Sequence, residues 1–584
     1  MEKKIVILGI NAYHADASAA IFVNGIMIAA IEEERFTRVK HWSGFPLKAI
    51  EFCLKEANVS IEQVSYIAIG RDPKAKFFKK ILFLAAHPFV SFSAIKERFS
   101  NRKKVGSIDF VLASHFGVSQ HLFNGKIKNI EHHLSHISSA FFASPFDESA
   151  CLSVDGSGDF TTTMTAIGKG NDIKVLDSVD FPHSLGLFYT AFTQLLGFPY
   201  YGDEYKVMGM APYGNPKYVD KIFEVIEHTK DGLFKINQSY FRSATSGIIN
   251  YGDDNIPVVA SMYNEKMIEL FGQPRQKNEA LTQYHKDMAA SVQRMTELTI
   301  FHLLNHLHKK TGSDNICIAG GVAQNSVANG KITRNTPFKN VYIPSAGHDA
   351  GISMGAALYV QHQQENLNRH HIKSAYTGSK FSNAEIENWL KSKGIQYELL
   401  ADEKLYDIVT DCLINGGVVG WMQGRAEFGP RALGGRSIIA DPRRNDAKEI
   451  LNAKIKRRES FRPFAPSILE DYVAEYFELD EPVPFMEKVF PIKEDKKSLI
   501  PAVTHVDGTG RLQTVMKDIS PRYYALIDAF RKKTGVPILL NTSFNENEPI
   551  VNSPEEAWNC YHRTNMDMLV MENILISRNS IESI

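Results

Sequence analysis

Three short apolar stretches lie close together at the start of the chain, and they constrain its fold more than any other feature. They are VILGI from Val6, ASAAIFV up to Val23, and IMIAAI from Ile26. Only Asn24 and Gly25 separate the last two stretches. An Asn-Gly pair favours the tight type I′ turn that joins neighbouring antiparallel strands. The sequence therefore predicts three successive strands, with the polar loop NAYHAD between the first and the second.

Two later segments have the same character, a buried strand that ends in a glycine-rich turn. One is CLSVDGSGDFTTT, which begins at Cys151, and the other is NICIAGGVAQNSVANG, which begins at Asn315. Glycines let backbone N–H groups approach a phosphate, and an aspartate in such a turn can hold a metal ion or a water. DGSGD alone is a weak signal, because many β-turns look like it. The candidates for cofactor contact are Asp155, Gly156, Gly158, Gly320, Gly321 and Asn325.

These three strand-and-turn elements predict an α/β domain over roughly the first 360 residues. The opening strands, with their turn and polar loop, are typical of the superfamily of actin, sugar kinases and heat-shock ATPases. A polar stretch at residues 361–380 predicts a domain boundary. We therefore expect a first domain at residues 1–365 and a second, of α+β character, at residues 376–584. The sequence shows no internal repeat.

Charge and cysteine content narrow the class of protein. Basic and acidic residues number 66 each and the pI is about 7.3, which argues against a general nucleic-acid binder. Five scattered cysteines without a CxxC pair argue against cysteine zinc sites and fit a reducing cytoplasm. The start, MEKKIVILGI, lacks the apolar core of a signal peptide. We expect a cytoplasmic protein.

One apolar segment, residues 81–92, is the only candidate for membrane contact. It is too short to span a bilayer, so we expect no integral membrane span. Four lysines precede it, so it could rest on a lipid surface. A buried helix is the favoured interpretation.

The motif EHHLSH indicates a metal site, because it places His132 and His136 four residues apart. On a helix the two imidazoles share a face and can bind one ion. A zincin-type metalloprotease would need glutamate where this chain has His133. Asp349, at a strand–helix junction in GHDAGISMGAA, could supply an oxygen, and this donor set suits iron, manganese or zinc better than magnesium. The alternative, a histidine pair hydrogen-bonded inside the core, stays open.

The polar loop after the first strand holds candidates for proton transfer, His14 and Asp16. His14 could accept a proton from an attacking hydroxyl while a carboxylate orients the ring. The segment GDEYKVMGMAPYG adds Asp203 before a turn. The alternative role of Asp203 is that of a helix N-cap.

A basic segment at residues 425–462 carries eleven Lys or Arg against five Asp or Glu, although the whole chain is neutral. Most of these residues are arginines, whose planar guanidinium groups suit bidentate binding of phosphate or carboxylate. The alternative is a merely basic surface. The chain contains no GxxxxGK[ST] and no GxGxxG motif. Side chains that could surround an anion are Lys456 and Arg458 (K-x-R), Ser543 and Asn545 (S-x-N), Arg425, Arg431, Arg462 and Arg511.

The motifs DGSGD, GDEYKVMGMAPYG, GGVAQNS, GHDAG, EFGPRALGGRS, IKRRESFRPFAP and NTSFN follow the HxxxH pair in this order. Together they resemble the O-carbamoyltransferases of natural-product and glycan tailoring, which include the tobramycin, cephamycin, novobiocin and nodulation-factor enzymes. Order and spacing agree over essentially the whole chain. The resemblance implies an N-terminal domain similar to the tRNA threonylcarbamoyl-transfer subunit, of actin-like fold, and a C-terminal domain similar to YrdC.

The resemblance also implies a reaction in two steps. Carbamoyl phosphate and ATP first give carbamoyl adenylate at the YrdC-like site. The carbamoyl group then passes to a hydroxyl of a small-molecule or glycan acceptor at the N-terminal metal site. The cofactors implied are ATP with magnesium and a divalent metal, iron ahead of manganese or zinc. No nucleic-acid partner is implied, and the acceptor and the oligomeric state, a homodimer included, stay open.

Residue roles follow from the matching motifs. The metal ligands implied are His132, His136 and Asp349. The catalytic groups implied are Lys456 and Arg511 in the second domain, with His14 and Asp16 on the acceptor side and Lys40 and Asp203 lining the same site. The ATP and phosphate contacts implied in the second domain are Arg425, Arg431, Arg458, Arg462, Asn541, Ser543 and Asn545.

Two other functions compete with this interpretation. One is a tRNA-modifying enzyme that makes threonylcarbamoyl adenylate, which shares both domain types, although the neutral pI argues against it. The other is a nucleotide-binding scaffold without turnover.

Overall fold

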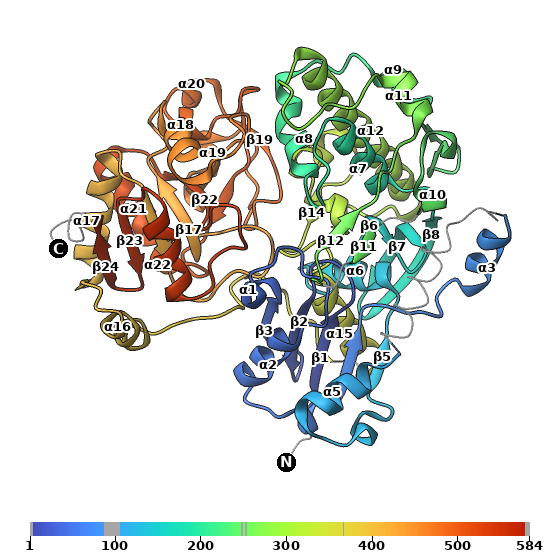
Figure 1. The fold of residues 1–584 in the computed structure, drawn as a ribbon, viewed down its shortest axis with the longest axis horizontal. Coiled ribbons are helices and arrows are strands. Elements are labelled where there is room, and N and C mark those ends of the chain that lie inside the picture. Colours follow the sequence, from blue (N-terminus) through green and yellow to red (C-terminus); the bar gives the residue numbers. More distant parts are fainter. Residues whose placement is uncertain (1–3, 87–105, 247–248, 252–253, 366, 579–584) are drawn as a thin grey trace. The chain divides into compact units, whose positions relative to one another are not determined.

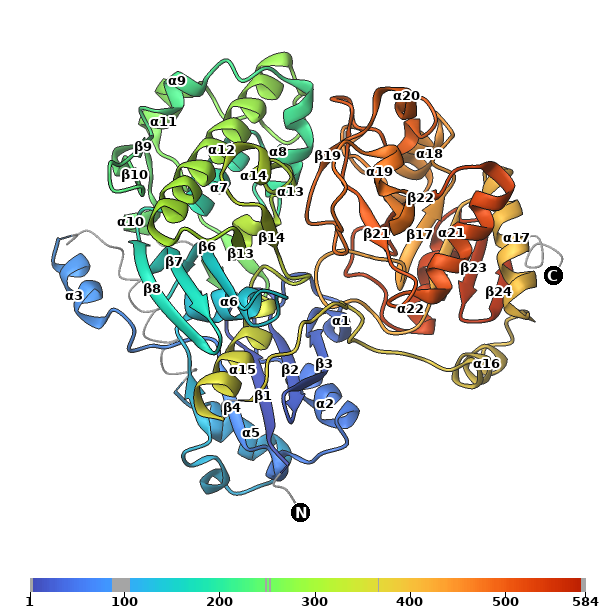
Figure 2. The same ribbon diagram turned by 180° about the vertical axis from the view of Figure 1, so that it is seen from behind.

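The computed structural model describes residues 4–86, 106–246, 249–251, 254–365 and 367–578. The chain divides into two compact units, Met1–Ile372 and Lys373–Ile584, and each has a hydrophobic core of its own. Both units mix helices and sheets, which confirms the expected mixed α/β class (Figures 1 and 2).

The first sheet of the first unit has the strand order β3-β2-β1-β4-β5. Its three opening strands are antiparallel, and Asn24 and Gly25 join two of them with φ angles of 48° and 90°, as a type I′ turn requires. The predicted hairpin is therefore confirmed. The strands are β1 (Val6–Asn11), β2 (Ser18–Val23), β3 (Ile26–Glu32), β4 (Tyr66–Ile69) and β5 (Ile127–Asn129).

The second sheet repeats this topology with the order β14-β13-β6-β7-β8. In both sheets three antiparallel strands are followed by two strands parallel to the first of them. A structural duplication is thus present although the sequence shows no repeat. The strands are β6 (Glu148–Gly158), β7 (Thr161–Lys169), β8 (Asp172–Asp180), β13 (Asn315–Ala319) and β14 (Asn340–Tyr342).

Two helices lie between the sheets and position the candidate site. Helix α6 (His132–Phe141) packs on β6, β7 and β13, and α15 (Gly351–Gln364) packs on β1, β2 and β4 (Figure 2). The helices also pack against each other, closely enough that a Cβ at Gly355 would lie 1.9 Å from the carbonyl oxygen of Ser135. The first turn of α6, the end of β6 and the start of α15 therefore meet in one place.

Further helices cover the outer faces. Helix α2 (Leu47–Glu56) packs on β2 and β3. The long helix α12 (Gln283–Thr311) packs against α7 (Leu185–Leu195) and α8 (Glu204–Met210). Helix α5 (Ile108–Phe116) contributes to the core beneath the first sheet.

Helix α3 (Phe77–Ala86) corrects a prediction made from the sequence. Its Phe78 and Leu82 side chains are 79% and 68% exposed, and only Phe83 is buried, against Phe160 and Phe181. The expected buried helix is therefore wrong for residues 81–86, and residues 87–92 of that segment lie outside the described residues. In the described part of the chain, no helix is long and apolar enough to cross a membrane.

The second unit is built on a sheet of eight strands in the order β15-β24-β23-β16-β17-β22-β18-β21. The segment MLVMENILIS forms an antiparallel hairpin of β23 and β24. Helices α17 (Asp402–Ile414), α21 (Pro521–Thr534) and α22 (Pro554–Arg563) pack on the sheet. The strands are β15 (Glu398–Leu399), β16 (Val419–Met422), β17 (Arg436–Ala440), β18 (Ala465–Leu469), β21 (Gln513–Val515), β22 (Ile538–Ser543), β23 (Met568–Met571) and β24 (Ile574–Ser577).

Candidate functional site

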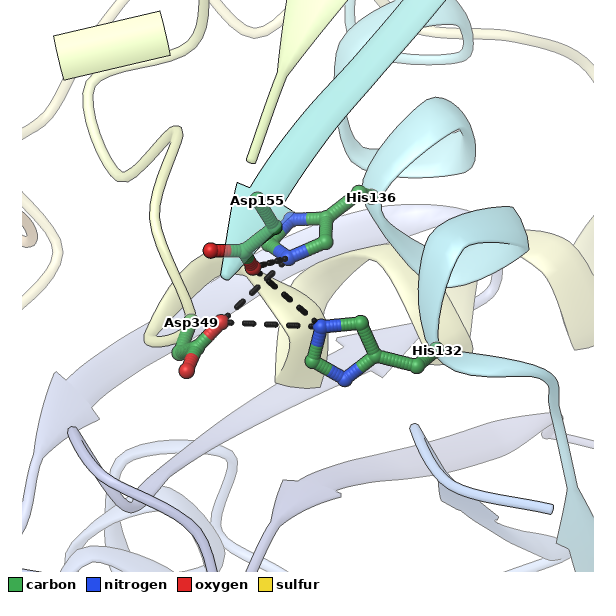
Figure 3. A group of neighbouring side chains, drawn as sticks. All are labelled: His132, His136, Asp155 and Asp349. Atoms are coloured by element: carbon green, nitrogen blue, oxygen red, sulfur yellow. Dashed lines mark hydrogen bonds and ion pairs between the residues drawn. The ribbon is translucent and has the colours of Figure 1, made fainter. Parts of the chain in front are cut away.

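Two imidazoles and two carboxylates converge between the sheets of the first unit (Figure 3). His132 Nε2 lies 3.3 Å from Asp155 Oδ2 and 3.7 Å from Asp349 Oδ1. His136 Nε2 lies 3.0 Å and 3.3 Å from the same two atoms. The predicted trio of His132, His136 and Asp349 is thus brought together, and Asp155 joins it as a fourth member. The sequence placed Asp155 in a phosphate-binding turn, and only the fold brings it opposite the histidines.

Local structure explains how these side chains meet. The carboxylate of Glu131 accepts a hydrogen bond of 2.7 Å from the amide of Leu134 and so caps the first turn of α6. Two glycines then let the neighbouring backbone approach these side chains. A Cβ at Gly158 would lie 2.0 Å from the ring of His132, and one at Gly321 would lie 2.8 Å from Asp155 Oδ1. Both glycines therefore make room for the cluster.

The charges in this cluster are strongly coupled. Burial lowers the pKa of His132. Burial also acts to lower the pKa of His136, but its hydrogen bonds to Asp155 and Asp349 outweigh this and raise the pKa to about 9. Burial acts to raise the pKa of Asp349, yet the neighbouring His14 and His136 bring it down to about 2. Burial also acts to raise the pKa of Asp155, but His132 and His136 hold it well below its usual range, so both carboxylates face the imidazole nitrogens as anions.

The donor set fits a divalent transition metal. Ligand atoms about 2.1 Å from one ion, at angles of roughly 90° to 120°, lie about 3.0 to 3.6 Å apart. The four nitrogen–oxygen distances between 3.0 and 3.7 Å match that spacing. Two imidazoles with two carboxylates suit iron, manganese or zinc. The neighbouring His133 is hydrogen-bonded inside the core, to Ser153 Oγ at 2.8 Å and to the Thr161 carbonyl at 3.0 Å. Metal binding by His132 and His136 stays a prediction, as does the alternative of a hydrogen-bonded histidine pair.

The two predicted acid–base residues have different partners. His14 Nδ1 lies 2.6 Å from Asp349 Oδ2, so Asp349 is the carboxylate that orients this ring. Asp16 instead contacts His41, whose Nδ1 lies 2.7 Å from Asp16 Oδ1. The side chain of Asn11 supports this loop by donating to the carbonyls of Ala15 and Asp16. His41 is absent from the residues predicted from the sequence, although it directly follows Lys40.

Asp203 and Lys40 differ in their surroundings. Asp203 is buried and its Oδ1 lies 2.7 Å from the amine of Lys206. It occupies the N-cap position of α8, as the alternative expected, but its carboxylate makes no cap hydrogen bond to that helix. Lys40 is exposed on the loop that also carries His41.

The remaining turn residues of this unit have structural contacts. Gly320 has a φ of 94°, and a Cβ there would lie 2.2 Å from the carbonyl oxygen of Val154. A Cβ at Gly156 would meet only Leu187, at 3.9 Å. The side chain of Asn325 caps a short helix at the amide of Ala328 and donates to Gln293, 3.0 Å away. These bonds engage the Asn325 amide group, and a nucleotide contact there stays a prediction.

The second unit gathers residues that are far apart in the sequence. Lys456 is 1% exposed, and its amine donates to the Ser543 carbonyl at 2.6 Å. The same amine donates to the carbonyl and the side-chain oxygen of Asn545 at 2.7 and 2.8 Å. The K-x-R and S-x-N motifs therefore meet, because the π-helical turn Asn452–Lys456, which follows the short helix α18 (Ala447–Leu451), lies beside the end of β22.

Arginines cluster in the same unit. Burial lowers the pKa of Arg511 well below its usual range, and the positive charges of Arg431, Arg458 and Arg462 lower it further. Arg511 Nε is buried without a hydrogen-bond partner among the described residues. The guanidinium of Arg458 also lies 4.6 Å from the ring centre of Phe464. Such a concentration of positive charge in a buried place favours an anionic ligand.

Two other residues predicted to contact phosphate take part in structural hydrogen bonds. Arg425 donates to the carbonyls of Thr377 and Gly378, each at 3.1 Å. The amide nitrogen of Asn541 donates to the Ala432 carbonyl and to Ser467 Oγ. The Asn541 side-chain oxygen is buried and has no hydrogen-bond partner among the described residues, and a phosphate contact of Asn541 stays a prediction.

Comparison with known proteins identifies the family. Residues 6–358 match the family model described as Carbamoyltransferase N-terminus, and residues 410–578 match Carbamoyltransferase C-terminus. The protein sll1178 of Synechocystis is 42% identical and covers 98% of this chain and 96% of its own length. The nodulation protein NolNO of Sinorhizobium fredii is 38% identical, over 97% of this chain and 80% of its own.

A solved structure, that of HypF from T. kodakarensis, is 14% identical and covers 63% of this chain and 49% of its own, with a TM-score of 0.30. That likeness carries no part of the assignment. The family models instead cover most of both units. The chain therefore belongs to the carbamoyltransferase family, as the order of its motifs indicates, and is an O-carbamoyltransferase.

Proposed function

We propose that this enzyme is an ATP-dependent O-carbamoyltransferase that works in two steps at two sites. Carbamoyl adenylate would form in the second unit, and the carbamoyl group would pass to a hydroxyl of a small-molecule or glycan acceptor in the first. The observation that carries this proposal is the separation of two chemically different clusters. One is cationic, around Lys456 and Arg511, and the other combines imidazoles with carboxylates, around His136 and Asp349.

In the first step two anionic substrates must meet. Water cleaves carbamoyl phosphate to carbamate and inorganic phosphate. A carbamate oxygen then attacks the α-phosphorus of ATP, the P–O bond between the α- and β-phosphates breaks, and carbamoyl adenylate and pyrophosphate result. Arg431, Arg458 and Arg511 offset the repulsion between the substrates and the charge that develops on the leaving group. Lys456 holds the S-x-N turn through Ser543 and Asn545, which fixes that turn at the end of β22.

In the second step a hydroxyl attacks the carbamoyl carbon. The C–O bond to the adenylate breaks, AMP leaves, and the hydroxyl proton passes to a base. We assign this role to His14, and the support is its contact with Asp349, whose Oδ2 lies 2.6 Å from Nδ1 and would leave Nε2 as the accepting atom. His132, His136, Asp155 and Asp349 would hold the divalent metal. Such an ion, when bound, supplies Lewis-acid stabilisation of phosphate oxygens.

The fold supports the same assignment. The duplicated sheet topology of the first unit is the feature on which we propose an actin-like fold. For the second unit we propose a YrdC-like fold, because its K-x-R and S-x-N motifs meet at one end of the sheet. The domain limits of residues 1–365 and 376–584 remain part of this proposal.

The test is a product analysis with carbamoyl phosphate and radiolabelled ATP. We expect pyrophosphate and AMP to accumulate without threonine or bicarbonate. A requirement for threonine and bicarbonate would support the tRNA-modifying alternative and contradict the proposal. Absence of any ATP turnover would support the idle scaffold.

A pair of buried lysines provides the matched variants. Lys456→Met should lower the rate of pyrophosphate release by ~10²–10³-fold, because a positioned cation of the activation site is lost. Lys488 is also buried, at 4% exposure, but its amine is paired with Glu481, so Lys488→Met should change this rate little. Equal losses in both variants, with unchanged melting temperatures, would remove Lys456 from the activation site.

A further inference from the structure

We propose that His41 is a positioning residue of the acceptor side, a role that rests on the function proposed above. Its imidazole joins the loop that carries Asp16 to the turn that carries Asp203. These aspartates come from distant parts of the sequence, and both belong to the proposed acceptor side. The imidazole is the group that links their two segments.

On one side, carboxylates fix the imidazole and its backbone. His41 Nδ1 lies 2.7 Å from Asp16 Oδ1, and the His41 amide donates to Glu34 Oε2 at 2.9 Å. Asp16 and His41 both have left-handed backbones, with φ angles of 57° and 55°. Such conformations are unfavourable for residues other than glycine and persist where surrounding contacts enforce them. The ring is therefore held in one orientation.

On the other side, the ring faces the turn before Asp203. A Cβ at Gly202 would lie 2.6 Å from His41 Nε2, so the absence of a side chain there lets the ring approach. The ring of Tyr201 meets the imidazole edge to face, with centroids 5.0 Å apart. Gly202 also has a φ of 81°, which favours glycine. The position of Asp203 thus depends on the imidazole through its two preceding neighbours.

The charge of the ring strengthens this link. Burial acts to lower the pKa of His41, but Asp16 and then Glu34 raise it to about 9, so the ring is an imidazolium at neutral pH. Asp16, Glu34 and His41 could also be regarded as a cation site, since their ligand atoms lie within 4.8 Å of one another. The Nδ1 atom and the Glu34 carboxylate are already engaged in hydrogen bonds, which favours the positioning role.

This role has a defined consequence for the reaction. Loss of the imidazole should loosen residues 200–203 and lower kcat/KM for carbamoyl transfer to the acceptor. Carbamoyl adenylate formation in the second unit should continue. His41→Asn and His41→Gln separate the two sides of the ring. Asparagine can keep the contact to Asp16 but is too short to reach Gly202, whereas glutamine extends to the position of Nε2.

The experiment combines hydrogen–deuterium exchange with kinetics on the full-length protein. In His41→Asn we expect amides of residues 200–206 to exchange at least about tenfold faster, since the turn opens locally, with an unchanged melting temperature. With methyl β-D-glucopyranoside as the hydroxyl probe, kcat/KM for carbamoyl transfer should fall by about tenfold or more, and pyrophosphate release should stay within about twofold. His41→Gln should restore part of both losses.

His115, on helix α5, provides the control. Its Nε2 also pairs with a carboxylate, that of Glu51, at a distance of 2.8 Å. His115→Asn should leave exchange at residues 200–206 unchanged. Gly202→Ala should disturb the turn at residues 200–203 less in the His41→Asn background than in the wild type, because the added Cβ then meets no ring.

Unchanged exchange of this turn in His41→Asn overturns the proposal. If the wild type releases no pyrophosphate, the proposed function is overturned instead. The exchange result would still decide the role of His41.

Discussion

At the scale of single residues, the candidate metal site depends on which imidazoles each carboxylate oxygen faces. Asp155 Oδ2 faces both His132 and His136, whereas Asp349 divides its two oxygens between these imidazoles and His14. Asp349 therefore connects the proposed metal site with the proposed base. The glycine at position 158 is part of this arrangement, because the His132 ring occupies the space of a side chain.

Substitution of that glycine tests the packing around the cluster. A Cβ at Gly158 would lie 2.0 Å from the His132 ring, so Gly158→Ala should displace the imidazole and lower iron or manganese affinity by ~10- to 100-fold. Gly156→Ala is the control, since its Cβ would meet only Leu187 at 3.9 Å. Metal content after reconstitution, measured by plasma mass spectrometry, reports the difference. Equal content in both variants would show that the His132 position does not matter for metal binding.

At the scale of elements, a buried carboxylate ties the start of α2 to the end of β3. Glu33 Oε2 accepts a hydrogen bond of 2.7 Å from the amide of Ala49, and Oε1 accepts one of 3.3 Å from the amide of Lys48. Despite these bonds, burial raises the pKa of Glu33 from its usual 4.5 to about 7. The folded protein therefore retains a proton there that the unfolded chain has lost.

The pH dependence of stability follows from this shift. Because the pKa is higher in the folded state, the contribution of Glu33 is fully present below about pH 4.5 and is lost as the pH rises to about 7. Between pH 5 and pH 8 this amounts to about 2 kcal/mol. Glu33→Gln should flatten the fall in the free energy of unfolding over that range, as measured by denaturant titration. A control at an exposed position of α17, Glu403→Gln, should not, and the same slope in all three proteins would contradict the assignment.

At the scale of the whole molecule, each unit builds its site where chain segments end. In the first unit, α6, β6 and the turn before α15 contribute the cluster, and the duplicated topology brings these segments together between two sheets. In the second unit, the π-helical turn Asn452–Lys456 after α18 meets the end of β22. The chemistry of the two sites differs, and each can be altered without touching residues of the other.

Local signals in the sequence made part of the fold and of the candidate site predictable. The Asn-Gly turn indicated the first hairpin, and the i, i+4 spacing of His132 and His136 indicated a shared helix face. An aspartate in a DGSGD turn could be expected to hold a metal ion, but the position of Asp155 beside His132 and His136 was not predictable, because such a turn looks the same beside a phosphate as beside a histidine. The pairing of Asp16 with His41 and the exposure of Phe78 were also missed, since both depend on which distant segments pack nearby. The duplicated topology left no repeat in the sequence.

The central claim is that activation and transfer occur at separate sites, and pyrophosphate release tests it most directly. The assay compares the wild type, Asp155→Asn and Lys456→Met, each supplied with carbamoyl phosphate and ATP. We predict that Asp155→Asn loses bound metal but keeps pyrophosphate release within about threefold, because its carboxylate takes no part in activation. Lys456→Met should keep its metal and lose release by ~10²–10³-fold. Comparable loss of pyrophosphate release in Asp155→Asn would contradict the separation of the two steps.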